Sequence, residues 1–222
     1  MTKERVTISQ LGHHGDGLAN TAQGIVSVPF TLPDETVIAE ITQQKEHLNG
    51  KLIEILTQSP ARAQPPCAVF GQCGGCRMQH IDTRSYGEWK LGVVNHQLEK
   101  NGFAARAETI FITPPATRRR VTFTAIKQPS GLQFGFHKRE SHDVVSIDDC
   151  SVIRPELASL IKPLRELLET TLQLNDTLSI HATILNGVIE LVFSGKLFAD
   201  DQTHHLISWA ATHGISRLFT KR

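Results

Sequence analysis

The chain has 222 residues, of which 40% are hydrophobic and 20% charged, with a formal net charge of +1. These values fit an ordinary globular protein of one or two domains, and by themselves they do not indicate a nucleic-acid-binding protein. No stretch approaches the roughly 18 apolar residues of a membrane span, and residues 1–7 lack the apolar region of a signal peptide. We therefore expect a cytoplasmic protein that makes no contact with a membrane. We also expect it to be a monomer.

Residues 1–62 predict a small all-β domain. Short stretches with strand-like alternation are separated by turn-rich sequence, and they cover residues 6–8, 24–28, 37–41 and 51–56. Short strands at this spacing predict a closed barrel of the OB type. Residues 1–64 carry five Lys/Arg against seven Asp/Glu, so any contact with RNA phosphates is expected from one edge only. The Pro-rich residues 59–66 then read as a linker.

Residues 63–222 predict an α+β domain with a mixed, mainly antiparallel sheet. Apolar residues at helical spacing predict helices at 83–102, 155–172 and 200–213, with Thr83 or Ser85 capping the first. Two hairpins are expected between them. The predicted hairpin strands are 119–127 with 132–138, and 178–185 with 188–194. Asn186-Gly187 between the last two is a strong signal for a type I′ turn.

All four cysteines of the chain are expected at one site. Cys67, Cys73 and Cys76 lie within ten residues, and Cys150 follows much later. Without a secretion signal, a cysteine cluster is more often metal-binding or catalytic than disulfide-forming. A redox-active Cys-Gly-Gly-Cys pair does not suit a Pro- and Gly-rich loop. A four-thiolate zinc site and an iron–sulfur cluster both remain open, although the irregular spacing favours the cluster.

The sequence around these cysteines resembles the cluster motif of the SAM-dependent RNA uracil-5-methyltransferases. The likeness begins at Cys67-x5-Cys73-Gly74-Gly75-Cys76-Arg77-Met78-Gln79-His80 and continues through residues 117–121, 135–139 and 147–153. Upstream, Gly12-His13-His14-Gly15-Asp16-Gly17 to Val28-Pro29-Phe30 looks like a TRAM domain, a small RNA-binding barrel. The resemblance implies a 4Fe–4S cluster on Cys67, Cys73, Cys76 and Cys150, with zinc as the competing occupant, and an RNA substrate.

The same resemblance leads us to expect that the catalytic domain is absent. Family members carry a Rossmann-like domain after this region, and it is through that domain that they would use SAM. Activation of uracil C5 requires a thiolate nucleophile, and no cysteine remains outside the predicted cluster. We therefore assign no catalytic and no SAM-binding residue in this chain.

A basic stripe is the second candidate site. Residues 65–150 hold eleven Lys/Arg against eight Asp/Glu, and Arg118-Arg119-Arg120 lies at the mouth of the first predicted hairpin. Alternation places Arg118 and Arg120 on one face, and Lys138 and Arg139 follow the partner strand. These four residues are the predicted RNA contacts. The alternative is a charged edge strand that discourages aggregation.

Three functions therefore remain. The chain is expected to be the RNA-recognising, iron–sulfur-binding part of an RNA uracil-5-methyltransferase that acts on rRNA or tRNA. The alternatives are a stand-alone RNA-binding iron–sulfur module and an electron-transfer iron–sulfur protein.

Overall fold

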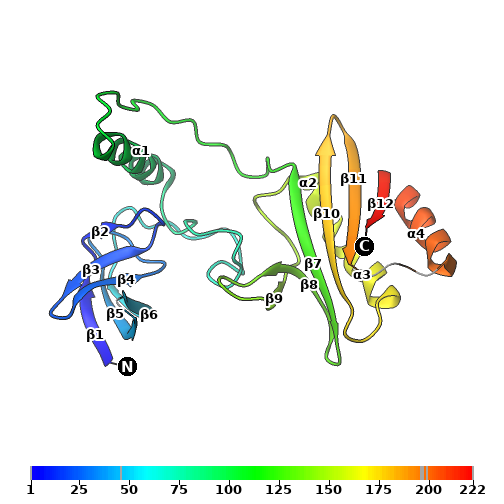
Figure 1. The fold of residues 1–222 in the computed structure, drawn as a ribbon, viewed down its shortest axis with the longest axis horizontal. Coiled ribbons are helices and arrows are strands. Elements are labelled where there is room, and N and C mark those ends of the chain that lie inside the picture. Colours follow the sequence, from blue (N-terminus) through cyan, green and yellow to red (C-terminus); the bar gives the residue numbers. More distant parts are fainter. Residues whose placement is uncertain (1, 46, 196–197, 199, 222) are drawn as a thin grey trace. The chain divides into compact units, whose positions relative to one another are not determined.

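The computed structural model describes residues 2–45, 47–195, 198 and 200–221. The chain divides into two compact units, shown in Figure 1. The first contains residues 1–66 and 76–112, and the second contains residues 67–75 and 113–222. Within the described residues, no helix is long and apolar enough to cross a membrane.

The first unit is built on a six-stranded mixed sheet in the order β1-β5-β6-β4-β3-β2. The strands are β1 Thr2–Thr7, β2 Gln10–Leu11, β3 Gly17–Thr21, β4 Gly24–Val28, β5 Thr36–Gln44 and β6 His47–Thr57. Alternate residues point inward, as β5 illustrates with Val37, Ala39 and Ile41. These side chains join those of β1, β3, β4 and β6 in one apolar core.

The prediction of a closed barrel is wrong in one respect, because the hydrogen-bonded ladder ends at β1 and β2. The chain bends at Ile8 and Ser9, so that β1 pairs with β5 while the two-residue β2 pairs with β3. A strand this short cannot carry the ladder further. Strand β3 lies between the predicted strands 6–8 and 24–28, in sequence that is rich in turn residues.

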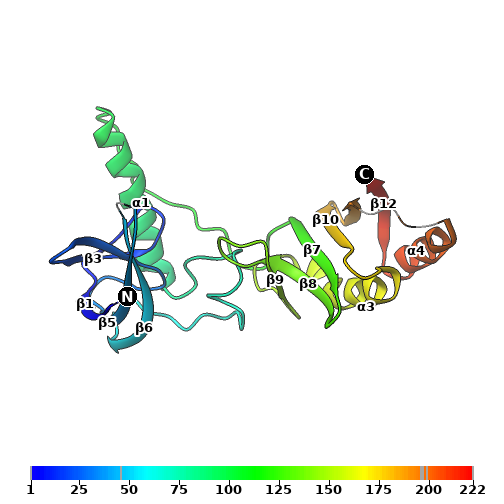
Figure 2. The same ribbon diagram turned by 60° about the horizontal axis from the view of Figure 1, so that its bottom comes forward.

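Helix α1, Thr83–Lys100, belongs to the first unit and lies beside this sheet (Figures 1 and 2). Its N-cap is Asp82, one residue before the predicted cap, and the carboxylate accepts hydrogen bonds from the Ser85 amide and hydroxyl at 2.9 and 2.7 Å. Gly15, in the turn before β3, lies against Met78 and Trp89, since a Cβ there would come within 2.5 Å of the Met78 sulfur.

The predicted linker is tied to the same unit. Ala63 donates from its backbone N–H to the carbonyl of His80 at 2.9 Å, and Asp82 donates to the carbonyl of Ala61 at 2.9 Å. Arg62 pairs with the fully buried Glu35. The compact units thus do not follow the predicted boundary at residues 62 and 63, because residues 76–112 fold with the barrel strands.

The chain then runs back along α1 without regular structure from residue 103 to 112. Asn95 holds it by two hydrogen bonds to one residue, donating to the Ala107 carbonyl at 3.0 Å and accepting from the Ala107 amide at 2.7 Å. Ile110 and Ile112 lie opposite Gly87, where a Cβ would come within 3.4 Å of both. Phe111 remains 87% exposed.

The second unit is a six-stranded sheet in the order β12-β11-β10-β7-β8-β9, antiparallel except for the β11–β12 pair. This confirms the predicted mixed, mainly antiparallel sheet. Its strands are β7 Arg120–Gln128, β8 Gly131–His137, β9 Val144–Ser146, β10 Thr177–Leu185, β11 Val188–Gly195 and β12 Ile215–Lys221. Both predicted hairpins are present, and Asn186 and Gly187 have φ values of 51° and 78°, as a type I′ turn requires.

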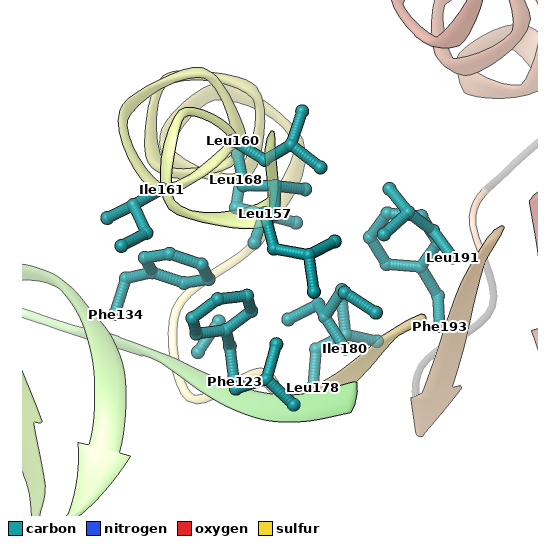
Figure 3. Close-up of a cluster of buried hydrophobic side chains, with 14 of the residues drawn as sticks. Phe123, Phe134, Leu157, Leu160, Ile161, Leu168, Leu178, Ile180, Leu191 and Phe193 are labelled. Carbon is teal, nitrogen blue, oxygen red and sulfur yellow. The ribbon is translucent and has the colours of Figure 1, made fainter. Parts of the chain in front are cut away.

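Helices α2 Pro155–Ala158, α3 Ile161–Thr171 and α4 Asp200–Thr212 complete this unit. The second predicted helix, 155–172, is therefore two helices. Pro163 accounts for the break, because it has no N–H and its ring would clash with the carbonyl of Ser159 in a continuous helix. Figure 3 shows leucines of α2 and α3 packed on Phe123 and Phe134 of the sheet, and these side chains form the core of the unit.

Candidate cysteine loop and nucleic-acid interface

The loop that holds Cys67 and Cys73 is fixed to the end of β8. Gly74 donates from its N–H to the His137 carbonyl at 2.9 Å, and Arg139 donates to the Gln72 carbonyl at 3.3 Å. Cys73 and Lys138 form an isolated β-bridge. A Cβ on Gly74 would come within 3.0 Å of the His137 carbonyl oxygen, so the close approach of these two segments depends on this glycine.

None of the four cysteines forms a disulfide, and each is half-buried. The Gly75 N–H points at the Cys73 sulfur at 3.4 Å, which is a contact that stabilises a thiolate. Cys150 packs against the core of the second unit, to which Cys67 and Cys73 also belong. Cys76 belongs to the first unit.

The structure does not present these thiols as a formed metal site. Among residues 2–45, 47–195, 198 and 200–221, no group of three His, Cys, Asp or Glu side chains is placed to hold a metal ion. The donor chemistry suits an iron–sulfur cluster or zinc, since thiols that are outside disulfides and partly accessible can be deprotonated by a metal. The assignment of Cys67, Cys73, Cys76 and Cys150 as ligands stays a prediction.

The arginines at the start of β7 line two neighbouring cavities in the second unit. Arg118, Arg119 and Arg120 line one of about 470 Å³ together with Thr183, Ile184 and Leu185. Arg118 and Arg120 also line one of about 360 Å³. Arg119 lines the larger cavity together with Arg118 and Arg120, whereas the smaller cavity is lined by Arg118 and Arg120 without it.

The backbone holds the arginines in place from both sides. The Arg118 N–H donates to the Val152 carbonyl at 3.1 Å, and the Arg118 carbonyl accepts from the Arg154 N–H at 3.0 Å. The Arg119 carbonyl accepts from the Ile184 N–H at 2.9 Å. These bonds tie the arginine segment to β10 and to the residues that follow Cys150.

Lys138 and Arg139 are placed differently. Lys138 pairs with Asp143 at 3.1 Å, and Arg139 pairs with Glu140 at 3.3 Å. Neither residue is among those that line the two arginine cavities. The structure therefore groups Arg118 with Arg120 and leaves Lys138 and Arg139 beside the cysteine loop. The role of all four in RNA contact stays a prediction.

The burial of His80 in the first unit was not predicted from the sequence. His80 is 1% exposed, and its ring lies 6.1 Å from that of Phe30. Burial and the nearby Arg62 charge lower its pKa to about 4. The only signal for burial was its place just before the helix cap, which does not identify the residues that surround it.

Comparison with known proteins places these features in context. Residues 2–52 match the model of the TRAM domain. The chain is 32% identical to an uncharacterized RNA methyltransferase of Rhizobium meliloti, over 98% of this chain and 53% of that protein. It is 34% identical to the 23S rRNA (uracil(1939)-C(5))-methyltransferase RlmD of Pectobacterium atrosepticum, over 73% of this chain and 37% of that protein.

The fold of this chain is also similar to that of a solved structure. The tRNA (uracil-54, C5)-methyltransferase of Pyrococcus abyssi, in complex with S-adenosyl-L-homocysteine, superposes with a TM-score of 0.66. The match covers 90% of this chain and 48% of that protein, at 21% sequence identity. The fold of this chain is thus similar to that of about half of the Pyrococcus protein.

The expectation that the protein lacks a catalytic domain is corrected here. The chain spans about half the length of the first relatives it matches, but the alignment with the Rhizobium protein runs through 98% of this chain. It gives no ground for describing the chain as an enzyme that has lost a domain. The chain contains a TRAM domain at residues 2–52, and it is related by sequence to RNA methyltransferases, among them 23S rRNA uracil-5-methyltransferases.

Proposed function

We propose that this chain is the RNA-recognising, iron–sulfur-binding part of a SAM-dependent RNA uracil-5-methyltransferase acting on rRNA or tRNA. The observation that carries the proposal is sequence similarity to named RNA methyltransferases along nearly the whole chain, together with the TRAM match. SAM would supply the methyl group in that reaction. No residue of this chain is proposed to bind SAM or to act as the nucleophile.

The proposed RNA contacts are Arg118, Arg120, Lys138 and Arg139. Guanidinium groups bind phosphate oxygens by paired hydrogen bonds, and the two arginines share a concave surface. Lys138 and Arg139 each have an acidic neighbour, so they are expected to contribute less than the arginine pair. Affinity should therefore fall steeply with salt.

The proposed ligands of a 4Fe–4S cluster are Cys67, Cys73, Cys76 and Cys150, with zinc as the competing occupant. The half-buried thiols and the amide hydrogen bond to the Cys73 sulfur support a thiolate site. When bound, such a cluster would contribute its binding free energy to folding, because ligands distant in sequence must come together around it. The protein is further proposed to be a monomer.

Three measurements test this function. Deleting the gene should remove one 5-methyluridine from rRNA or tRNA, and an unchanged nucleoside profile in both would overturn the proposed activity. Anaerobically purified protein should contain about four irons and four sulfides per chain, whereas one zinc and no iron would assign the thiols to zinc. Sedimentation of the purified protein should show a single monomeric species.

A further inference from the structure

The second sheet has one face covered by helices and one face open to solvent. Phe123, Ile180 and Leu191 of β7, β10 and β11 point into the helix-covered core, which Figure 3 shows on one side of the sheet. Residues of opposite parity therefore point to the other side. The pairing register places them in rows that run across four strands from β7 to β12.

Two of these rows have an unusual composition. One row is Thr122, His181, Val192 and Phe219, and the next is Arg120, Thr183, Glu190 and Arg217. His181 is exposed, and Phe219 is 50% exposed although its neighbour Leu218 packs against the core. The first row therefore presents two aromatic rings on the same face of the sheet, two strands or about 10 Å apart.

Charge on this face is mainly positive. Arg120, Arg217 and Lys221 are cations of the open face, and Glu190 is the carboxylate among the residues of the two rows. Glu190 is already paired with Arg217 at 3.8 Å. At the β7 end, the smaller of the two arginine cavities, of about 360 Å³, continues this surface. It is lined by Thr122, His181 and Thr183 together with Arg118 and Arg120. The charge is complementary to an anionic chain.

His181 is also held in a defined orientation. Its Nδ1 lies 2.9 Å from the Thr122 hydroxyl, across the β7–β10 pair. A ring fixed in this way loses less conformational freedom when a ligand stacks on it than a freely rotating ring would. The basic cavity and the ring surface thus meet at His181.

We propose that this open sheet face binds single-stranded RNA, with a backbone phosphate in the Arg118–Arg120 cavity and bases stacked on His181 and Phe219. The inference rests on the proposed function and names the surface and the form of RNA that it takes. Every base has a π face, so stacking on exposed rings suits unpaired nucleotides, whereas a duplex keeps its bases stacked on each other. Sequence preference is therefore expected to be slight.

The experiment compares binding of a 12-nucleotide oligouridylate and of an RNA duplex of equal length to the full chain. Phe219→Ala and His181→Ala should each weaken oligouridylate binding roughly fivefold or more. Leu174→Ala is the matched apolar control, since Leu174 is 56% exposed in the turn before β10. Arg118→Ala with Arg120→Ala should flatten the salt dependence by about one to two units, while Lys162→Ala on helix α3 should leave it unchanged.

A direct readout comes from Phe219→Trp, which keeps a stacking ring and should bind oligouridylate with quenching of the added tryptophan fluorescence. If the wild-type chain binds no RNA at low salt, the proposed function fails with this inference. If it binds RNA but the Phe219 and His181 variants bind like Leu174→Ala, the inference alone is overturned. Equal affinity for duplex and single strand would also overturn the inference. It would indicate that the chain binds RNA through phosphates alone and that this sheet face does not contact bases.

Discussion

Arg62 donates from Nε and Nη2 to the two carboxylate oxygens of Glu35, at 2.5 and 2.8 Å, across 27 positions of sequence. The carboxylate also accepts from the backbone amides of Leu32 and Ser59, and Arg62 donates to the Phe30 carbonyl. Burial alone would raise the pKa of Glu35, but the hydrogen bonds from Arg62 and the two amides outweigh it and the pKa is lowered. This ion pair holds the predicted linker against the barrel strands.

Arg62→Ala should therefore destabilise the first unit by about 3–5 kcal/mol, because it leaves the fully buried Glu35 charge without its partner. Glu35→Gln should cost less, since Arg62 is 16% exposed and can reach water. Denaturant unfolding of the three proteins gives these differences. The control is Arg84→Ala, which removes an 89% exposed arginine in the same unit and should change stability by less than about 1 kcal/mol. Equal stability of wild type and Arg62→Ala would show that the Arg62–Glu35 ion pair does not hold the linker against the barrel strands.

His80 predicts a dependence of stability on pH. Burial and the Arg62 charge depress its pKa from 6.5 to about 4, while the Thr31 backbone, Glu35 and Asp16 act in the opposite direction. Between pH 6.5 and 4, His80 is mainly protonated in the unfolded chain and mainly neutral in the folded chain. The free energy of unfolding therefore falls as pH falls from 6.5 towards 4. The loss should reach roughly 2 kcal/mol at pH 5.

His80→Gln removes this proton and should flatten the decline between pH 6.5 and 5. Glu35 acts in a lower range, because its lowered pKa adds stability that is lost only as pH falls below about 4.5. Thermal melts of the wild type, His80→Gln and Glu35→Gln at pH 7, 5 and 4 separate the contribution of His80 from that of Glu35. An equally steep decline in His80→Gln would assign the acid sensitivity elsewhere.

Gly74 tests whether the docking of the cysteine loop matters for metal retention. Gly74→Ala leaves all four thiols in place but puts a Cβ within 3.0 Å of the His137 carbonyl oxygen, so the loop must move from β8. We expect a loss of bound iron, measured per chain after anaerobic purification. Gly92→Ala is the control, because no atom lies within 4 Å of its Cβ position in α1. Full iron content in Gly74→Ala would show that binding does not depend on this contact.

The sequence predicted those elements whose signals are local. Asn186-Gly187 specified its turn, and helix α1 ends at Lys100, within two residues of the predicted end, with Gly102 following at φ 78°. Pro163 was a visible signal for the break between α2 and α3, and it was overlooked because the leucine pattern continues across it. The Arg62–Glu35 pair and the β11–β12 pairing could not be predicted. Each joins segments that are separated in sequence, and no local pattern in either segment identifies the segment that it contacts.

The candidate sites divide in the same way. Cys67, Cys73, Cys76 and Cys150 were grouped from their residue type and spacing. Spacing does not specify how a loop docks, and the contact of Gly74 with β8 was not anticipated. Alternation paired Arg118 with Arg120, and these two line one cavity together, but all three arginines line the other. It did not identify His181, because β10 lies beside β7 only through non-local pairing.

Asn95 predicts a local rather than a global effect. Its side chain occupies both the N–H and the carbonyl of Ala107, so Asn95→Ala removes two hydrogen bonds that hold the irregular segment 103–112 against α1. Each is worth about 1 kcal/mol, but the segment buries little else, and Phe111 and Phe103 are 87% and 62% exposed. Amide hydrogen exchange in residues 104–112 should therefore accelerate roughly tenfold or more, while the unfolding midpoint of the first unit changes little.

His96→Ala, an exposed neighbour on α1, is the matched control and should leave exchange in that segment unaltered. If Asn95→Ala instead lowered the stability of the whole unit as much as Arg62→Ala, the segment would be an integral part of the barrel unit rather than a strap held by one side chain.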